Sequence, residues 1–120
     1  MEYLFRGKTI GGKWVEGDLI HGVRHKKGQL FILPIVDNLA NCPGADPLDG
    51  YSVIPSTVGM WTGKTDKNGK RIFEADKDQY GDTVVWDNEN CCFAFKMKYG
   101  LLPFHTIDFK WVEITGTIHD

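Results

Sequence analysis

Short apolar stretches separated by glycine, asparagine and aspartate run along the whole chain. The 14 glycines recur between these stretches, and no window of a dozen residues keeps apolar side chains at the 3.6-residue spacing of a helix. Short apolar runs alternating with turn residues are typical of an all-β domain. We therefore expect short antiparallel strands and no long helix.

The first half of the chain contains a predicted hairpin and a loop. Residues 14–20 form a predicted strand that bends or bulges at Gly17, because glycine weakens a strand unless the backbone needs its freedom. Residues 29–33 are its predicted partner, across a polar turn at 25–28. Two prolines and several Asp and Asn residues then predict a surface loop at 37–50.

The second half begins with an extended segment at 51–54, and Pro55 favours one short helical turn at 55–57. The strongest turn signal is Asn68-Gly69, which tolerates the positive φ of a tight hairpin. The other predicted strands are 58–62, 71–74, 83–86, 91–97, 104–107 and 111–118.

About six to nine such strands close most naturally into a barrel or a small sandwich. A chain of 120 residues has room for one full core. We predict one all-β, barrel-like domain over residues 1–120, with at most one short helical turn.

The net charge and the number of cysteines disfavour several classes of protein. The chain has 14 Lys plus Arg against 16 Asp plus Glu, so it lacks the basic excess of a dedicated duplex-DNA binder. Its first residues show no basic region followed by an apolar core, so we expect no signal peptide, and no apolar run comes near the roughly 20 residues that span a bilayer. The three cysteines, two of them adjacent, do not suggest a disulfide framework. We expect reduced thiols and a cytoplasmic location.

Three stretches occur in a specific order along the chain. Residues 5–20 combine Phe-Arg-Gly-Lys with Trp-Val-Glu-Gly-Asp, residues 58–76 contain Asp-Lys-Asn-Gly-Lys, and residues 112–118 form an apolar-polar strand pattern. In order and spacing they resemble the YopX-like family of bacteriophage and prophage proteins over nearly the whole chain. The chain departs from the family at Ala75, where the family has glycine, and at 77–80, where polar residues replace an apolar pair.

The resemblance implies a mostly β, barrel-like fold, a phage or prophage origin and the cytoplasm of a bacterial host as the location. It implies no catalytic residue, because the family has no established activity. We accordingly predict that the protein is not an enzyme.

Four carboxylates form a candidate cation site, Glu16 with Asp18 and Glu74 with Asp76. Side chains two apart on a strand share a face, and oxygen ligands suit Mg²⁺ and Ca²⁺. The alternative is a solvated strand face, or a turn in which aspartate accepts backbone hydrogen bonds. No His or Cys residues form the paired ligands of a zinc site, and Cys91 and Cys92 lie in an apolar run. We predict no metal and no cofactor.

Two basic windows are candidates for contact with single-stranded nucleic acid. One covers residues 21–27, and aromatic residues Trp14, Trp61, Tyr51 and Phe73 lie near the two windows in sequence. Small barrels can combine such cations with stacking platforms, but lysines in turns also serve solubility and large aromatics fill cores. The second window consists of Lys64, Lys67, Lys70 and Arg71.

The main hypothesis is a non-enzymatic interaction or assembly module. Many short strands and aromatic residues leave sheet edges and apolar surface to be covered, and pairing between copies is one remedy. The expected partners are a phage or host protein, or a second copy of the chain in a homo-oligomer. The alternative is a regulatory protein that binds single-stranded DNA or RNA.

Overall fold

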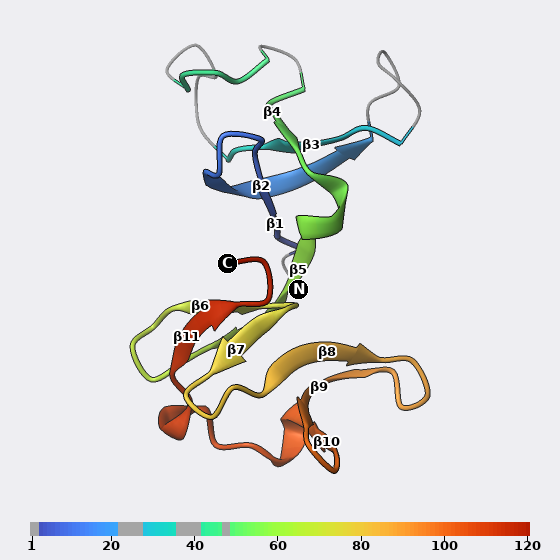
Figure 1. Cartoon of the computed structure of the whole chain (residues 1–120), viewed down its shortest axis with the longest axis vertical. Helices are drawn as coiled ribbons and strands as arrows, with labels where there is room; N and C mark the ends of the chain where they lie inside the picture. The colour runs from blue at the N-terminus through green and yellow to red at the C-terminus, as the bar shows by residue number, and fades with distance from the viewer. Residues whose placement is uncertain (1–2, 22–27, 36–41, 47–48) are drawn as a thin grey trace. The chain divides into compact units, whose positions relative to one another are not determined.

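The computed structural model describes residues 3–21, 28–35, 42–46 and 49–120. The chain divides into two compact units, residues 2–60 and residues 61–120 (Figure 1). Each unit consists of antiparallel strands, and the helices among the described residues are single 3₁₀ turns. The all-β prediction is confirmed. The single domain stays a prediction, since two compact units can still unfold together.

The unit 2–60 holds strands in the order β4-β3-β2-β1-β5, of which β5 continues into the unit 61–120. All of its neighbouring strands are antiparallel. Its elements are β1 (Phe5–Lys8), β2 (Trp14–His21), β3 (Leu30–Leu33), β4 (Tyr51–Val53), the 3₁₀ turn η2 (Pro55–Thr57) and β5 (Gly59–Thr65).

Strand β2 changes its neighbour in the middle. Residues 14–17 pair with β1 and residues 18–21 pair with β3, without a register shift. Of the two alternatives expected at Gly17, a bend or a bulge, the bulge is absent from β2. Glycine is required for another reason, because a Cβ atom at this position would collide with the carbonyl group of Leu33.

The core of the unit 2–60 is a cluster of buried side chains from β2, β3 and β4. Cys42 and Ala45, which belong to the predicted loop 37–50, pack against this cluster. The backbones of Asp46 and Gly50 exchange two hydrogen bonds of 2.7 and 2.9 Å. The rest of that loop lies partly outside the described residues. The buried members of the cluster are Val15, Ile32, Tyr51 and Val53.

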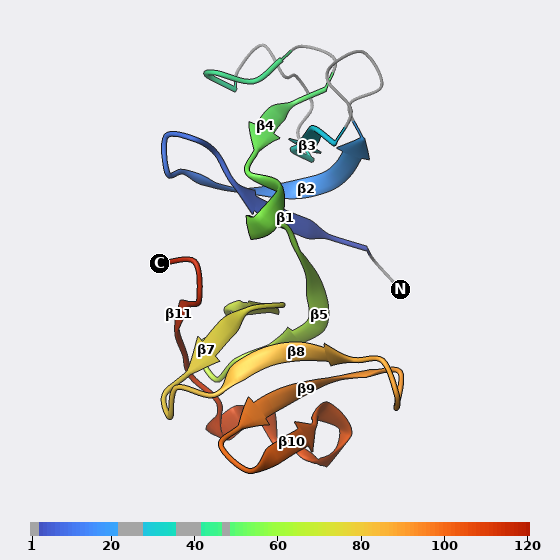
Figure 2. The ribbon, with the colours of Figure 1, turned by 45° about the vertical axis from the view of Figure 1, so that its right-hand side comes forward.

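The unit 61–120 contains a five-stranded sheet in the order β10-β9-β8-β7-β11, and β6 pairs with β5 (Figure 2). Two further 3₁₀ turns separate β10 from β11 in sequence. The elements are β6 (Arg71–Phe73), β7 (Asp76–Asp78), β8 (Thr83–Asp87), β9 (Cys92–Met97), β10 (Gly100–Pro103), η3 (Phe104–Thr106), η4 (Phe109–Trp111) and β11 (Ile114–Thr117).

Aromatic rings pack the segment after β10 against one face of β9. The Phe104 ring lies 5.1 Å from the Phe95 ring and 5.0 Å from the Phe109 ring, measured between centroids. The prediction of a strand at 104–107 is wrong, because Pro103 leads into a 3₁₀ turn instead. The hydroxyl group of Thr106 closes that turn by donating to the Pro103 carbonyl at 2.7 Å.

The predicted architecture differs from the structure in two further respects. No closed barrel is formed by the described strands, because β10 and β11 end the five-stranded sheet without pairing to each other. The described residues also contain three 3₁₀ turns where one was expected. Both later turns depend on local side-chain bonds, the second on Asp108, whose carboxylate accepts from the Lys110 N–H at 3.2 Å.

Buried aspartates hold the turns of the unit 61–120. The Asp66 carboxylate accepts from the N–H groups of Asn68 at 2.9 Å and Lys70 at 3.0 Å within the β5–β6 turn. Its second oxygen accepts from the Ile114 N–H at 2.9 Å, which ties this turn to the start of β11. Burial raises the pKa of Asp66, but these three N–H groups and the nearby Lys70 charge outweigh burial and lower it below its usual value.

Ala75 lies between β6 and β7 with a φ of 73°, in the left-handed region that glycine adopts most easily. Two backbone hydrogen bonds hold the conformation, from the Ala75 N–H to the Val84 carbonyl at 2.9 Å and from the Ile118 N–H to the Ala75 carbonyl at 3.0 Å. The chain therefore keeps the turn geometry despite the Cβ atom.

We predict that Asp66→Asn lowers the free energy of unfolding at pH 7 by about 2–3 kcal/mol, because an amide has one acceptor oxygen and leaves a buried N–H unsatisfied. The lowered pKa means that the carboxylate stabilises the fold above the unfolded pKa of about 3.9, and that this contribution is lost as the pH falls through the folded value. Urea unfolding at pH 7 and pH 3 should show the difference between wild type and variant shrinking in acid.

Asp108→Asn is the matched control, because this exposed carboxylate accepts one backbone hydrogen bond. Its effect should stay within about 0.5 kcal/mol. Equal destabilisation by both substitutions would contradict the role assigned to Asp66.

Candidate functional site

A pocket with a volume of about 360 Å³ opens in the unit 61–120 beside β9 and β10. Phe95 and Met97 lie on the same face of β9, and Leu102 of β10 lies directly opposite Phe95. Ile107 and Val112 line the pocket from the segment that follows β10. The floor of the pocket is therefore apolar.

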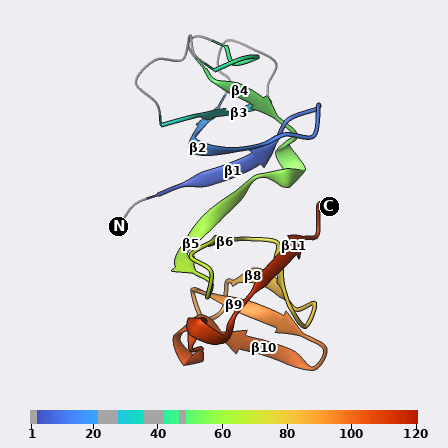
Figure 3. The ribbon, with the colours of Figure 1, turned by 90° about the vertical axis from the view of Figure 1, so that its left-hand side faces the viewer.

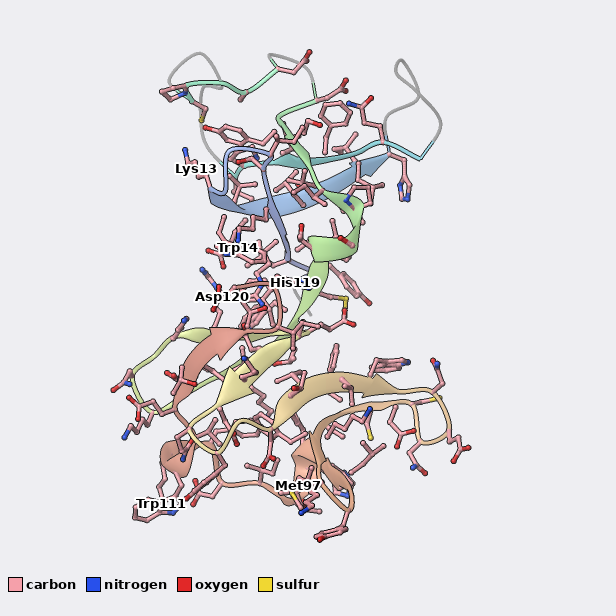
Figure 4. All side chains as sticks on the ribbon, viewed as in Figure 1. Lys13, Trp14, Met97, Trp111, His119 and Asp120 are labelled. Atoms are coloured by element: carbon pink, nitrogen blue, oxygen red, sulfur yellow. The ribbon has the colours of Figure 1, made fainter. Side chains whose placement is uncertain are left out.

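Two exposed aromatic rings, Tyr80 and Trp111, also line the pocket. The Trp111 side chain is 72% exposed, although the backbone beneath it is fixed. The side-chain amide of Gln79 donates to the Trp111 carbonyl at 2.8 Å and accepts from the Glu113 N–H at 3.0 Å. Figure 4 shows Trp111 and Met97 at the end of this unit that carries β10 and the 3₁₀ turns.

Three carboxylates also line the pocket: Asp78, Asp82 and Asp108. In Asp78, Oδ1 accepts from the N–H groups of Tyr80 and Asp82, both at 3.0 Å. The Asp82 carboxylate has no hydrogen bond or ion pair to another described residue. Burial, followed by the Asp78 charge, raises the pKa of Asp82 above its usual value. The pocket is therefore negatively charged, and no described residue neutralises the Asp82 carboxylate.

The four cations predicted to contact nucleic acid, Lys64, Lys67, Lys70 and Arg71, are all exposed on or beside the β5–β6 turn. The structure brings them together as neighbours on one hairpin. The Lys67 ammonium pairs with the Glu113 carboxylate at 3.4 Å. The Lys64 ammonium lies 5.8 Å from the Phe109 ring centroid, and the Arg71 guanidinium lies 5.5 Å from the Trp61 ring centroid.

The aromatic residues proposed as stacking platforms are less accessible. Phe73 and Tyr51 are 2% and 7% exposed and belong to the packed interior of their units, so neither offers an open ring face. Trp14 lies in the unit 2–60 (Figure 4), where the Arg6 guanidinium is 4.7 Å from its ring centroid. Except for His21, the members of the first basic window, at 22–27, fall outside the described residues.

The two carboxylate pairs considered for a cation belong to different units. Glu16 and Asp18 are exposed on β2 in the unit 2–60, and Glu74 and Asp76 belong to the unit 61–120. Asp76 is 1% exposed and accepts from the Phe73 N–H at 2.8 Å, which is the turn role named as the alternative. Across the described ranges, no three His, Cys, Asp or Glu side chains gather as metal ligands.

The cysteine positions differ from the sequence interpretation. Cys91 is exposed and lies in the turn before β9 with a φ of 49°, rather than inside an apolar strand. Cys92 begins β9 and is half-buried. Neither residue lines the pocket.

Comparison of the chain with known proteins found no similar protein. No protein-family profile matches the chain, and neither a curated protein nor a solved structure matches it. The YopX-like resemblance therefore stays a prediction from the sequence. In the described ranges, no helix has the length and apolar character needed to cross a membrane.

We predict that Asp82→Asn raises the melting temperature at pH 7, by an amount equivalent to about 0.2–1 kcal/mol. A raised folded pKa means that the native state binds the proton more tightly than the unfolded state, so the Asp82 charge costs stability as the pH rises above about 3.9. Thermal unfolding at pH 7 and pH 3 should show the gain only at pH 7. Glu89→Gln, an equal change of charge at an exposed turn, should leave both melting temperatures unchanged.

Proposed function

We propose that the protein is a non-enzymatic assembly module that pairs with a second copy of itself along β10. The observation that carries this proposal is the character of that strand. Leu101 and Leu102 are 44% and 39% exposed, and the strand contains no charged residue. An uncharged edge strand with apolar side chains is a template for pairing with another chain.

The other strand edges are shorter or less regular, and strand β6, for example, is three residues long and its register with β5 shifts between Trp61 and Thr65. Strand β11 has a register shift between Ile114 and Gly116, and such irregularities disfavour edge pairing. Strand β4 is three residues long, with Tyr51 and Val53 buried. Strand β10 pairs with β9 in regular register over all four of its residues (Figure 3). Its free side therefore offers the most regular edge in the described part of the chain.

Origin and location belong to the same proposal. The YopX-like pattern supports a phage or prophage protein that acts in the cytoplasm of a bacterial host, where a phage or host protein is a further candidate partner. These statements rest on the sequence alone.

Leu101→Lys tests the assembly through β10. Leu101 lies opposite Lys96 and one residue from Leu102, so its side chain points away from the pocket face. We expect light scattering after size-exclusion chromatography to give a dimer or larger assembly for wild type and a folded monomer for the variant. Ile10→Lys, at a residue that is 89% exposed in the unit 2–60, should keep the wild-type mass. A wild-type monomer at all accessible concentrations would refute the proposal.

Binding of single-stranded nucleic acid remains the second candidate, favoured by the cations near aromatic rings on the β5–β6 hairpin. In this case Lys64→Glu with Lys70→Glu should weaken binding to oligothymidine at least tenfold, measured by fluorescence anisotropy at low salt. The matched control is Lys96→Glu with Lys98→Glu, which changes the net charge equally on exposed residues of β9 and the turn after it. Equal losses in both double variants would show an effect of net charge alone.

A further inference from the structure

We propose that the pocket of the unit 61–120 receives an arginine side chain from a basic segment of a protein partner. The apolar stem would lie on Met97 and Leu102, the guanidinium plane against Trp111, and the positive charge beside Asp82. This inference goes beyond assembly through β10, because the pocket and Leu101 lie on opposite faces of that strand.

The size and lining of the pocket suit a side chain with an apolar stem. Its volume of about 360 Å³ lies near the lower end of the about 300–1,000 Å³ typical of small-ligand sites. Met97 and Leu102 are each 39% exposed, above the buried Phe95. Long basic side chains bury their methylene groups on such surfaces while their charged ends stay near water.

The carboxylates of the pocket favour an occupant whose end carries a positive charge. Asp82 carries no partner among the described residues, and Asp78 uses only Oδ1 for its two hydrogen bonds. An anionic occupant such as a phosphate group would be repelled by these carboxylates. A cation would instead lower the electrostatic cost that raises the pKa of Asp82.

Trp111 favours arginine over lysine as the cation. Trp111 is 72% exposed as a residue, on a backbone that the Gln79 amide holds from both sides. A guanidinium group is planar, is less strongly hydrated than an ammonium group and stacks on aromatic faces, and its forked donors fit carboxylates.

The rim of the pocket already combines a cation, a carboxylate and an indole ring within the chain. The Lys110 ammonium lies 3.3 Å from the Asp108 carboxylate and 5.9 Å from the Trp111 ring centroid. Lys110 and Asp108 are both more than half exposed, so this pair is a weak surface contact. The deeper acidic positions, Asp78 and Asp82, remain for a cation supplied by the partner.

Nuclear magnetic resonance on the full chain tests the inference with three capped tripeptides. The probes are acetyl-Ala-Arg-Ala-amide and its counterparts with lysine or citrulline, which is nearly isosteric with arginine but uncharged. We expect the arginine peptide to shift the Trp111 indole and Gln79 amide resonances saturably, with a Kd of about 1 mM or below. Citrulline should bind at least tenfold more weakly and lysine severalfold more weakly.

Substitutions of pocket residues test whether the arginine peptide binds in the pocket. Asp82→Asn should weaken the arginine peptide at least fivefold, and Trp111→Leu should weaken it by a similar factor. Neither side chain makes a hydrogen bond to another described residue, and matching amide spectra would show that each variant is folded. Glu89→Gln removes the same charge as Asp82→Asn at an exposed turn outside the pocket, and it should leave the Kd unchanged.

Four results would overturn the inference: no saturable shift up to the solubility limit of the arginine peptide, equal affinity for citrulline, equal or tighter binding of lysine, or equal losses in Asp82→Asn and Glu89→Gln. The test is independent of assembly, because Leu101→Lys should bind the arginine peptide with wild-type affinity. Loss of the oligomer with retained peptide binding would separate the two proposals.

Discussion

The Asp66 carboxylate is the constraint on which the rest of the unit 61–120 depends. It closes the β5–β6 turn and, through the Ile114 N–H, anchors the start of β11. The neighbouring Lys67 N–H adds a bond to the Val112 carbonyl at 2.9 Å. Gln79 holds the same segment from the β7 side, by the Trp111 carbonyl and the Glu113 N–H. Because this segment is also a wall of the pocket, the turn and the candidate site share one set of backbone hydrogen bonds.

The strands that the sequence predicts correctly are those in which apolar residues meet a strong turn signal. The Asn68-Gly69 turn and the apolar run of β9 are examples, because local geometry and burial favour the same state there. Strand β7, Asp-Lys-Asp, was missed because its aspartates are buried by hydrogen bonding rather than by hydrophobicity. The turn at Phe104–Thr106 was missed because a proline and one hydroxyl bond override an apolar strand pattern.

The candidate sites differ in how far the sequence reveals them. Lys64 to Arg71 form one hairpin, so their proximity follows from the turn signal alone. The pocket brings Asp82, Met97 and Trp111 together from distant parts of the chain, and this proximity depends on the pairing of β8, β9 and β10 and on the fold of the segment after them.

The order of the strands also determines when the five-stranded sheet can be completed during translation. Strand β11 pairs with β7, so the five-stranded sheet cannot be complete until Thr117 has left the ribosome. Translation of the roughly 39 residues that follow β7, up to Thr117, takes about 2–8 s at the usual bacterial and eukaryotic rates. For those seconds the β7 side of the nascent sheet lacks its neighbour. A nascent chain of this protein thus exposes the edge of β7, which the irregular strand β11 covers in the finished chain.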